Sequence, residues 1–304
     1  MLKVYIVLQL VIKSRYQKNK ALFILFWSDP FRDDSNALQE RIIRREKEAQ
    51  MDHRKGTKKK VASQKTIWLF GTHAVQDALL NNKRQKLRLI VTRNAYNRLK
   101  IPIEKADVQP EVCTARKFSA PLEDGSVHQG AALETKPLEW GPLTKHTISK
   151  DRGSILLVLL DQITDPQNVG AILRSAEVFG ATAVVSTIRH GAPETGALAK
   201  SASGALERQP YVRVRNLAES ILELQKMGFI VLGLDETAKK TVLEIVKYHR
   251  NRPTALVFGA EGSGLRSRTK KTVDQLVSIP SRNCFGSLNV SNAAAVALYT
   301  LRLI

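Results

Sequence analysis

The sequence predicts an α/β fold for residues 154–304, and two observations carry this prediction. Short apolar runs rich in Val, Ile and Leu recur along this half of the chain, and stretches with helical spacing of apolar residues separate them. The runs are continuous rather than alternating, which is typical of parallel strands covered by helices on both faces. The predicted strands span residues 154–160, 182–187, 210–214, 229–234, 254–259 and 275–279.

A smaller α/β unit is predicted for residues 66–140. It would begin with a strand at 66–71, followed by a helix at 73–82 and a second strand at 86–92. Prolines and turn residues obscure the remainder of this unit, and a linker is predicted at 141–153. The inward face of its helix would contain Ala74, Ala78 and Leu79.

Composition and charge indicate a globular protein with a polyanionic partner. The 304 residues are 43% hydrophobic, which is enough to give two domains a core. The formal net charge of +20 divides into +9 for residues 1–65, +5 for 66–150 and +6 for 151–304, and such an excess favours nucleic acid. Cys113 and Cys284 lie far apart, so neither a disulfide framework nor a zinc site is indicated and a reducing cytosol fits best.

The first 65 residues are expected to form a basic extension without fixed structure, with Met51 as an alternative start. The apolar stretches 4–12 and 21–27 are too short to span a bilayer. The basic segment between them offers no small-residue cleavage site, so a secretory signal peptide is not indicated either. A mitochondrial-type presequence is the functional alternative to a bacterial cytoplasmic protein.

Three motifs place polar groups where apolar strands end. In LVFGAEGSGL, which starts at Leu256, the glycines Gly259, Gly262 and Gly264 allow close backbone approach to a ligand or a positive φ. Glu261 stands among them and could accept hydrogen bonds or be a solvated turn residue. The spacing is not that of a dinucleotide-binding loop, so a dehydrogenase is disfavoured.

The second motif, DPQNVGAILRSAEVFGA from Asp165, predicts a helix with Asn168 as its N-cap and Gly180 as its stop. Arg174 falls on the polar face of this helix. It is either a solvated arginine or, beside a helix N-terminus, a ligand for an RNA phosphate. The inward stripe would be Ile172, Ala176 and Phe179.

The third motif, IPSRNCFGSLNVSNAAAVALY from Ile279, predicts a final Ala-rich helix at 292–301 with Ser291 as its N-cap. Ser287 and Asn289 would lie in an irregular loop before it. Asn289 could equally be a turn former, because Asn suits left-handed and Asx-turn positions.

The order and intervals of these motifs resemble the SpoU, or TrmH, branch of the SPOUT RNA methyltransferases. The resemblance covers Ser154 to the C-terminus, and LFGTHAVQDALL from Leu69 resembles the opening of the ribosomal-L30-like RNA-binding domain fused to some members. It implies a parallel sheet with a C-terminal trefoil knot, a rare exception to the rule against threaded chains. It also implies S-adenosylmethionine as cofactor, a homodimer and no metal.

The resemblance also assigns site residues by motif. Gly259, Ile279 and Leu288 would contact the cofactor largely through the backbone. The loop containing Cys284 and Phe285 departs from the family pattern and touches no matched residue. The active-site positions would be Asn168, Arg174, Glu261, Ser287 and Asn289.

The chemistry of 2′-O-methylation fits this residue set. A weakly acidic ribose hydroxyl must attack a methyl sulfonium in line, so positioning and charge compensation carry most of the catalysis. A guanidinium is almost never deprotonated, so we hypothesise that Arg174 holds the substrate phosphate and stabilises the developing alkoxide. Glu261 and Asn289 would position the ribose or the loop.

The fused small domain favours 23S rRNA, and a guanosine ribose, as the substrate that the resemblance implies. The small domain and the basic tail would hold the RNA, with residues 71–73 opening a helix that could meet it, and residues 292–301 would form the dimer contact. A tRNA ribose methyltransferase is the alternative within the enzyme class. A non-catalytic RNA-binding ribosome-assembly factor is the alternative outside it.

Overall fold

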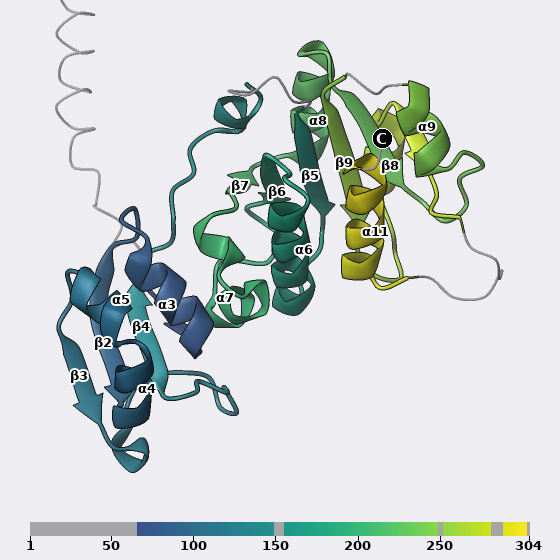
Figure 1. The fold of residues 1–304 in the computed structure, drawn as a ribbon. Coiled ribbons are helices and arrows are strands. Elements are labelled where there is room, and N and C mark those ends of the chain that lie inside the picture. Colours follow the sequence, from purple (N-terminus) through teal and green to yellow (C-terminus); the bar gives the residue numbers. More distant parts are fainter. Residues whose placement is uncertain (1–65, 149–154, 249–251, 281–287, 303–304) are drawn as a thin grey trace, which may run out of the picture. The chain divides into compact units, whose positions relative to one another are not determined.

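The computed structural model describes residues 66–148, 155–248, 252–280 and 288–302 (Figure 1). All of them belong to one compact unit, Gln64–Ile304. The predictions for residues 1–65, including the alternative start at Met51, lie outside the described residues. No helix within the described ranges has the length and apolar character needed to cross a bilayer.

The larger sheet confirms the α/β prediction. Its six strands lie in the order β10-β8-β9-β5-β6-β7, and every neighbouring pair is parallel. Each predicted strand is present to within two residues at either end. The strands are β5 (Leu156–Asp161), β6 (Ala183–Thr187), β7 (Tyr211–Val214), β8 (Ile230–Leu234), β9 (Thr254–Gly259) and β10 (Gln275–Val277).

Helices cover both faces of this sheet, which explains the continuous apolar runs. In β5, Val158 and Leu160 join the core cluster on the face of α6, α9 and α11, whereas Leu157 and Leu159 join the cluster under α8. The helices are α6 (Pro166–Val178), α7 (Gly196–Ala202), α8 (Leu217–Lys226), α9 (Val242–Tyr248), α10 (Ser267–Thr272) and α11 (Val290–Arg302).

The smaller sheet has the order β1-β4-β2-β3, with β4 antiparallel to both β1 and β2. The predicted helix and its buried residues Ala74, Ala78 and Leu79 are confirmed. The elements are β1 (Ile67–Phe70), α3 (Thr72–Leu80), β2 (Lys86–Thr92), α4 (Arg93–Arg98), α5 (Lys100–Lys105), β3 (Pro110–Cys113) and β4 (Ala131–Thr135). Short 3-10 turns are η1 (Ala115–Lys117), η2 (Leu143–His146) and η3 (Ala205–Glu207).

Two predicted helix caps are wrong. Asp165, not Asn168, caps α6: its carboxylate accepts the backbone N–H of Gln167, and the following proline suits the first helical position. Helix α11 begins at Val290, so its cap is Asn289 rather than Ser291. Both helices start earlier than predicted, which places Asn168 and Ser291 inside the first turn.

Candidate active site

The polar site lies at the carboxyl edge of the larger sheet. Strands β5 and β9 are parallel neighbours, with Asp161 paired to Gly259 where both end. The loop that carries Glu261 therefore leaves the sheet beside the segment that leads into α6. Ligands of open parallel sheets bind at this edge, as the sequence predicts.

Three of the predicted residues form one hydrogen-bonded cluster. The amide of Asn168 donates to Glu261 Oε1 at 3.2 Å. The amide nitrogen of Asn289 donates to the same oxygen at 2.6 Å and to Asn168 Oδ1 at 3.0 Å. Asn168 is buried, whereas Glu261 and Asn289 are exposed, so the cluster has an anchored side and an open side.

Asn289 also caps α11. Its Oδ1 accepts the backbone N–H of Ser291 at 2.9 Å, the Ser291 hydroxyl at 2.6 Å and the N–H of Asn292 at 3.4 Å. Because the oxygen is committed to the helix N-terminus, the amide nitrogen must face Glu261 and Asn168. The turn-former alternative is thus met, and the same side chain contacts two other residues of the predicted active site.

Arg174 lies further along α6 and is exposed, as its place on the polar face predicts. Its guanidinium forms no hydrogen bond or ion pair with any residue in the described ranges, in contrast to Arg84, Arg88, Arg208 and Arg266. An exposed guanidinium of this kind keeps its donors available for a bidentate anion.

The glycine loop after β9 is folded back on itself. Gly262 and Gly264 adopt φ values of 80° and 62°, and the N–H of Gly264 donates to the carbonyl of Ala260 at 2.9 Å. A Cβ on Gly259 would collide with the backbone of Gly264 and Leu265. The requirement for glycine at this position thus comes first from the loop's own tight turn.

The three residues that the resemblance assigns to the cofactor lie where β9 ends, after β10 and directly before α11. Ile279 follows β10, is half-buried and packs against the core, while Leu288 keeps 53% of its surface exposed before α11. Ser287, Cys284 and Phe285 lie outside the described residues.

Sequence reasoning missed an ion pair beneath the loop. Asp161 is fully buried, and its carboxylate accepts the backbone N–H of Arg266 at 3.1 Å and the guanidinium Nε at 2.7 Å. This pair holds the end of the glycine loop to the end of β5. A signal was present, because an acidic residue ends an otherwise apolar strand.

A separate polar pocket of about 270 Å³ is lined by residues between α3 and β2 and by the segment 136–140 after β4. Lys83 Nζ lies 5.8 Å from the centre of the Trp140 ring at this pocket. None of the clustered active-site residues lines it. It is therefore distinct from the site at the sheet edge.

Comparison with known proteins agrees with this architecture. Residues 155–299 match the model of the SpoU rRNA Methylase family, and residues 68–141 match that of RNA 2′-O ribose methyltransferase substrate binding. A 23S rRNA (guanosine-2′-O-)-methyltransferase RlmB of Photobacterium profundum is 35% identical over 76% of this chain and 95% of its own length. The RlmB of Vibrio vulnificus is 33% identical over 76% of this chain and 94% of its own.

Solved structures share the fold at lower identity. The SpoU methyltransferase AviRb from Streptomyces viridochromogenes, in complex with AdoMet, superposes with a TM-score of 0.67 at 23% identity and covers 78% of this chain and 89% of its own. An AdoMet-bound rRNA methyltransferase from Sinorhizobium meliloti gives a TM-score of 0.63 at 20% identity, covering 83% of this chain and 90% of its own.

Proposed function

Because the chain belongs to the SpoU rRNA methylase family and is an S-adenosylmethionine-dependent RNA 2′-O-ribose methyltransferase, we propose that it methylates a guanosine ribose of 23S rRNA. The observation that carries the proposal is the Asn168–Glu261–Asn289 cluster, formed by residues from all three motifs. This chain covers 95% and 94% of the two RlmB relatives, and the 23S rRNA guanosine activity in their names supports the choice of substrate. These relatives are bacterial, which favours a bacterial cytoplasmic protein.

The cluster and Arg174 divide the work of the reaction. The chemistry that S-adenosylmethionine supplies when bound is an electrophilic methyl group. Arg174 holds the phosphate next to the target ribose and stabilises the alkoxide that develops on its 2′-oxygen. Glu261, fixed by the two amides, holds the ribose in line, and the proton leaves through the phosphate or water because a guanidinium does not accept it.

Gly259, Ile279 and Leu288 hold the cofactor at the carboxyl edge of the sheet in this proposal, with Ser287 as a further active-site position. The apolar side chains of Ile279 and Leu288 and the main chain of Gly259 would suit the adenosine moiety. The C-terminal part of the larger domain would form the trefoil knot that the family resemblance implies.

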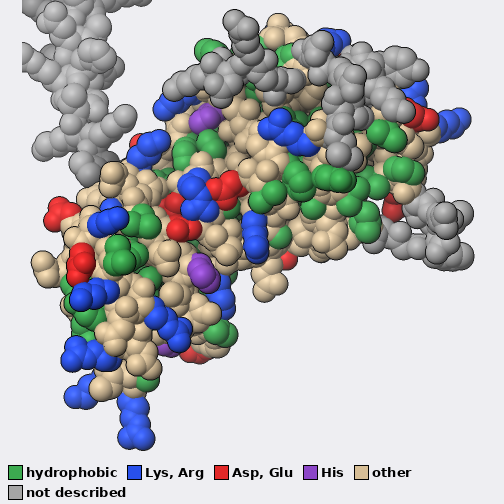
Figure 2. All heavy atoms as spheres, in the orientation of Figure 1, with side chains coloured by type: hydrophobic (Ala, Val, Ile, Leu, Met, Phe, Trp, Pro, Cys, Tyr) green, Lys and Arg blue, Asp and Glu red, His purple; other side chains and the backbone are tan. Residues whose placement is uncertain are grey.

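The small sheet holds the RNA. Exposed cations stand along α4 and α5, and Lys and Arg side chains are spread over the face of this sheet domain in Figure 2. Such side chains bind phosphates without reading sequence. The set on the two helices consists of Arg93, Arg98, Lys100 and Lys105, and His73 is exposed at the start of α3.

The active form is a homodimer through α11. Val296 and Tyr299 are exposed on this helix, and the Tyr299 ring lies 5.9 Å from that of Phe179 at the end of α6, next to the exposed Val178. Apolar side chains of this kind form the core of subunit interfaces. Light scattering should give twice the chain mass, and Tyr299→Glu should shift the protein to monomer.

Methyl transfer from labelled cofactor to unmodified 23S rRNA and to total tRNA tests the proposed substrate. Label in a 23S guanosine, located by a primer-extension stop at the 2′-O-methyl, supports it. Label in tRNA alone would instead favour the tRNA enzyme. Cofactor binding without methyl transfer to either RNA would favour the alternative of a non-catalytic ribosome-assembly factor.

A further inference from the structure

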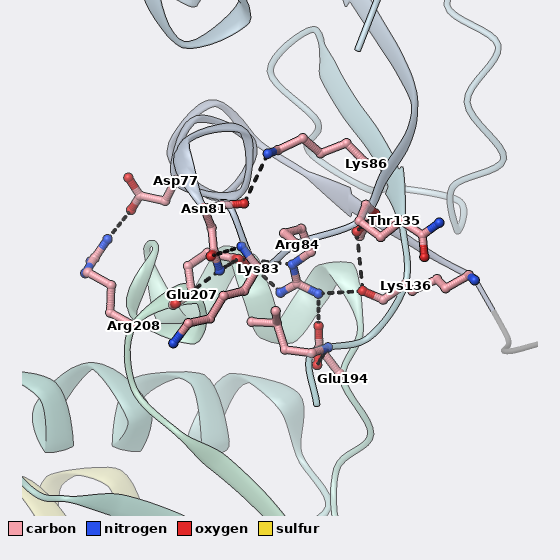
Figure 3. A network of polar contacts seen from close by, with 12 residues as sticks. Asp77, Asn81, Lys83, Arg84, Lys86, Thr135, Lys136, Glu194, Glu207 and Arg208 are labelled. Carbon is pink, nitrogen blue, oxygen red and sulfur yellow. Dashed lines mark hydrogen bonds and ion pairs between the residues drawn. The ribbon is translucent and has the colours of Figure 1, made fainter. Parts of the chain in front are cut away.

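A buried arginine joins the small sheet to the catalytic domain (Figure 3). Arg84 lies between α3 and β2, and only 3% of it is exposed. Its Nε and Nη2 donate to the two carboxylate oxygens of Glu207 at 3.0 Å and 2.5 Å, and its Nη1 pairs with Glu194. Both acids belong to the catalytic domain, one in η3 and one just before α7.

The remaining groups of this network are also satisfied. Asn81 donates to Glu207 at 2.8 Å, the N–H of Leu138 donates to Glu194 at 3.1 Å, and Arg84 Nη1 donates to the carbonyl of Lys136 at 2.9 Å. Burial acts to lower the pKa of Arg84, but the hydrogen bonds and charges of the two acids outweigh it and raise the pKa. A buried ion pair is weak evidence for stability, because desolvation offsets its Coulombic gain, and in some proteins its role is to fix geometry.

A second arginine extends the connection to the active-site helix. Arg208 Nη1 lies 2.9 Å from Asp77 Oδ2 of α3, and its guanidinium also pairs with Glu177 of α6. Glu177 stands one turn beyond Arg174 on the same helix. One side chain thus bridges the RNA-binding domain and the helix that carries two of the proposed active-site residues.

The backbone makes the same connection through α7. A Cβ on Gly196, at the start of α7, would collide with the carbonyl of Trp68 and the ring of Phe70 in β1. On its other side α7 meets α6, where a Cβ on Gly170 would lie 2.5 Å from Ser201 Cβ. The buried apolar residues of the small sheet and of α6 form one continuous cluster.

We propose that Arg84, Arg208 and α7 form a rigid joint that holds the RNA-binding sheet at a fixed position relative to α6. The inference rests on the proposed function, because the joint would keep RNA that is bound to the small sheet at a fixed distance from Asn168 and Arg174. Arg84 is a positioning residue: it touches neither RNA nor cofactor and acts through Glu194 and Glu207.

The joint is tested first by a distance. Spin labels at Ile101→Cys on α5 and Leu222→Cys on α8, in the full chain with Cys113 and Cys284 replaced by Ser, report the separation of the two domains without RNA. Both label positions are exposed. Each doubly labelled protein is mixed with an excess of its unlabelled counterpart, so that a dimer carries one spin pair. The parent should then give one narrow distance distribution and Arg84→Met a broad one, whereas a narrow distribution in Arg84→Met would overturn the proposal.

Kinetics give the second readout. In unlabelled Arg84→Met, the single-turnover rate at saturating rRNA should fall about 10- to 100-fold, because a small misplacement of reacting groups costs this much. The dissociation constants for rRNA and S-adenosylmethionine should stay as in the parent. A change in these constants with an unchanged rate would assign Arg84 to binding rather than positioning.

The matched control is Arg88→Met. Arg88 forms an equally bidentate pair with Glu111, at 2.7 Å and 2.8 Å, but that pair is exposed and lies within the small sheet. It should change neither the distance distribution nor the rate. Arg208→Met removes the ion pairs of the half-exposed Arg208 with Asp77 and Glu177, and it is the variant to use if Arg84→Met does not fold. It should also broaden the distance distribution.

The two proposals fail separately. A parent protein that transfers no methyl group to rRNA would refute the proposed substrate, while the spin-label distances would still decide whether the joint is rigid.

Discussion

At the scale of single residues, Asn289 has two tasks that share one amide group. Its oxygen caps α11 and its nitrogen holds Glu261 and Asn168. The stability of the last helix and the geometry of the site are therefore linked. Substitutions that keep only one of the two tasks can separate them.

Asn289→Ser should keep the cap and lose the site, whereas Asn289→Ala should lose both. Serine accepts the same helix N–H groups, but alanine does not, and a lost cap costs about 1 kcal/mol. Denaturant unfolding should therefore place the alanine variant below the serine variant by about this amount, while single-turnover methyl transfer falls in both. Equal stabilities would show that the cap contributes nothing.

Arg174→Lys tests whether the planar guanidinium of Arg174 binds the phosphate through two hydrogen bonds. Lysine keeps the charge but cannot contact a phosphate bidentately, so turnover should drop by roughly 10- to 100-fold, the value of a lost charge-assisted hydrogen bond. S-adenosylmethionine binding, measured by calorimetry, should be unchanged. Arg268→Lys, at an exposed position of α10, is the control. Nearly full turnover in Arg174→Lys would rule out bidentate phosphate binding.

At the scale of elements, the sequence predicted the strands of the larger sheet but not all of those in the smaller one. The continuous apolar runs are unambiguous because both faces are covered. β4 escaped prediction because AALET is short and partly polar, and it pairs between β1 and β2, which precede it by many residues. β3 begins with a proline and is mostly exposed, so it carries no strand pattern.

The sequence named the positions of the candidate site but could not predict the contacts among them. Asn168 and Glu261 are 93 residues apart in sequence, and no local pattern states that their side chains meet. Arg84 is a clearer example of a contact that no local sequence pattern predicts. It stands in the polar segment NNKRQK, which predicts a solvated turn, and its burial depends on acids more than a hundred residues further on.

Gly170→Ala should destabilise the protein although alanine is the better helix former. The added Cβ would lie 2.8 Å from the backbone nitrogen of Ala202 and the carbonyl of Leu198, and such overpacking costs about 1–3 kcal/mol. Thermal unfolding should show the loss. Gln167→Ala, at an exposed position of the same helix, should show none. A stabilised Gly170→Ala would mean that α6 and α7 move apart easily.

Asp235, in the loop after β8, should make the free energy of unfolding depend on pH in the acid range. Burial acts to raise its pKa, but Lys270 and Thr237 outweigh this and lower it. The carboxylate therefore stabilises the fold above its unfolded pKa of about 3.9, and this contribution is lost as pH falls through the lower folded value. Unfolding midpoints of the parent and Asp235→Asn should differ at pH 6, and the difference should shrink as the pH falls below the unfolded pKa of about 3.9.

Parallel curves for Asp235→Asn and the parent would contradict this assignment. Glu236→Gln, at the exposed neighbouring position, controls for the loss of one charge from the same loop.

At the scale of the whole molecule, the charge of +20 acts on association with RNA rather than on folding. The described cations of α4 and α5 are exposed, and those of the joint are paired with acids. Of these two sets of described cations, the exposed one on α4 and α5 is available to phosphates.

Replacing Arg93, Arg98 and Lys100 with Gln should weaken rRNA binding without regard to sequence. Each lost phosphate contact reduces the slope of log K against log salt by about 0.7–0.9. Filter binding across a salt series measures the slope, and the single-turnover rate at saturating RNA should be retained. An unchanged slope would place the RNA on another surface.

The buried Arg84 also limits how this protein can be recombined with others. A catalytic domain separated from its small sheet would keep Glu194 and Glu207 side by side without their cation. A chimera that received the sheet of a distant homologue would need an arginine at the same place to neutralise them. The small domain and the catalytic domain can therefore be exchanged between homologues only when the arginine and the two acids are both present. A chimera that inherits one without the other should be unstable.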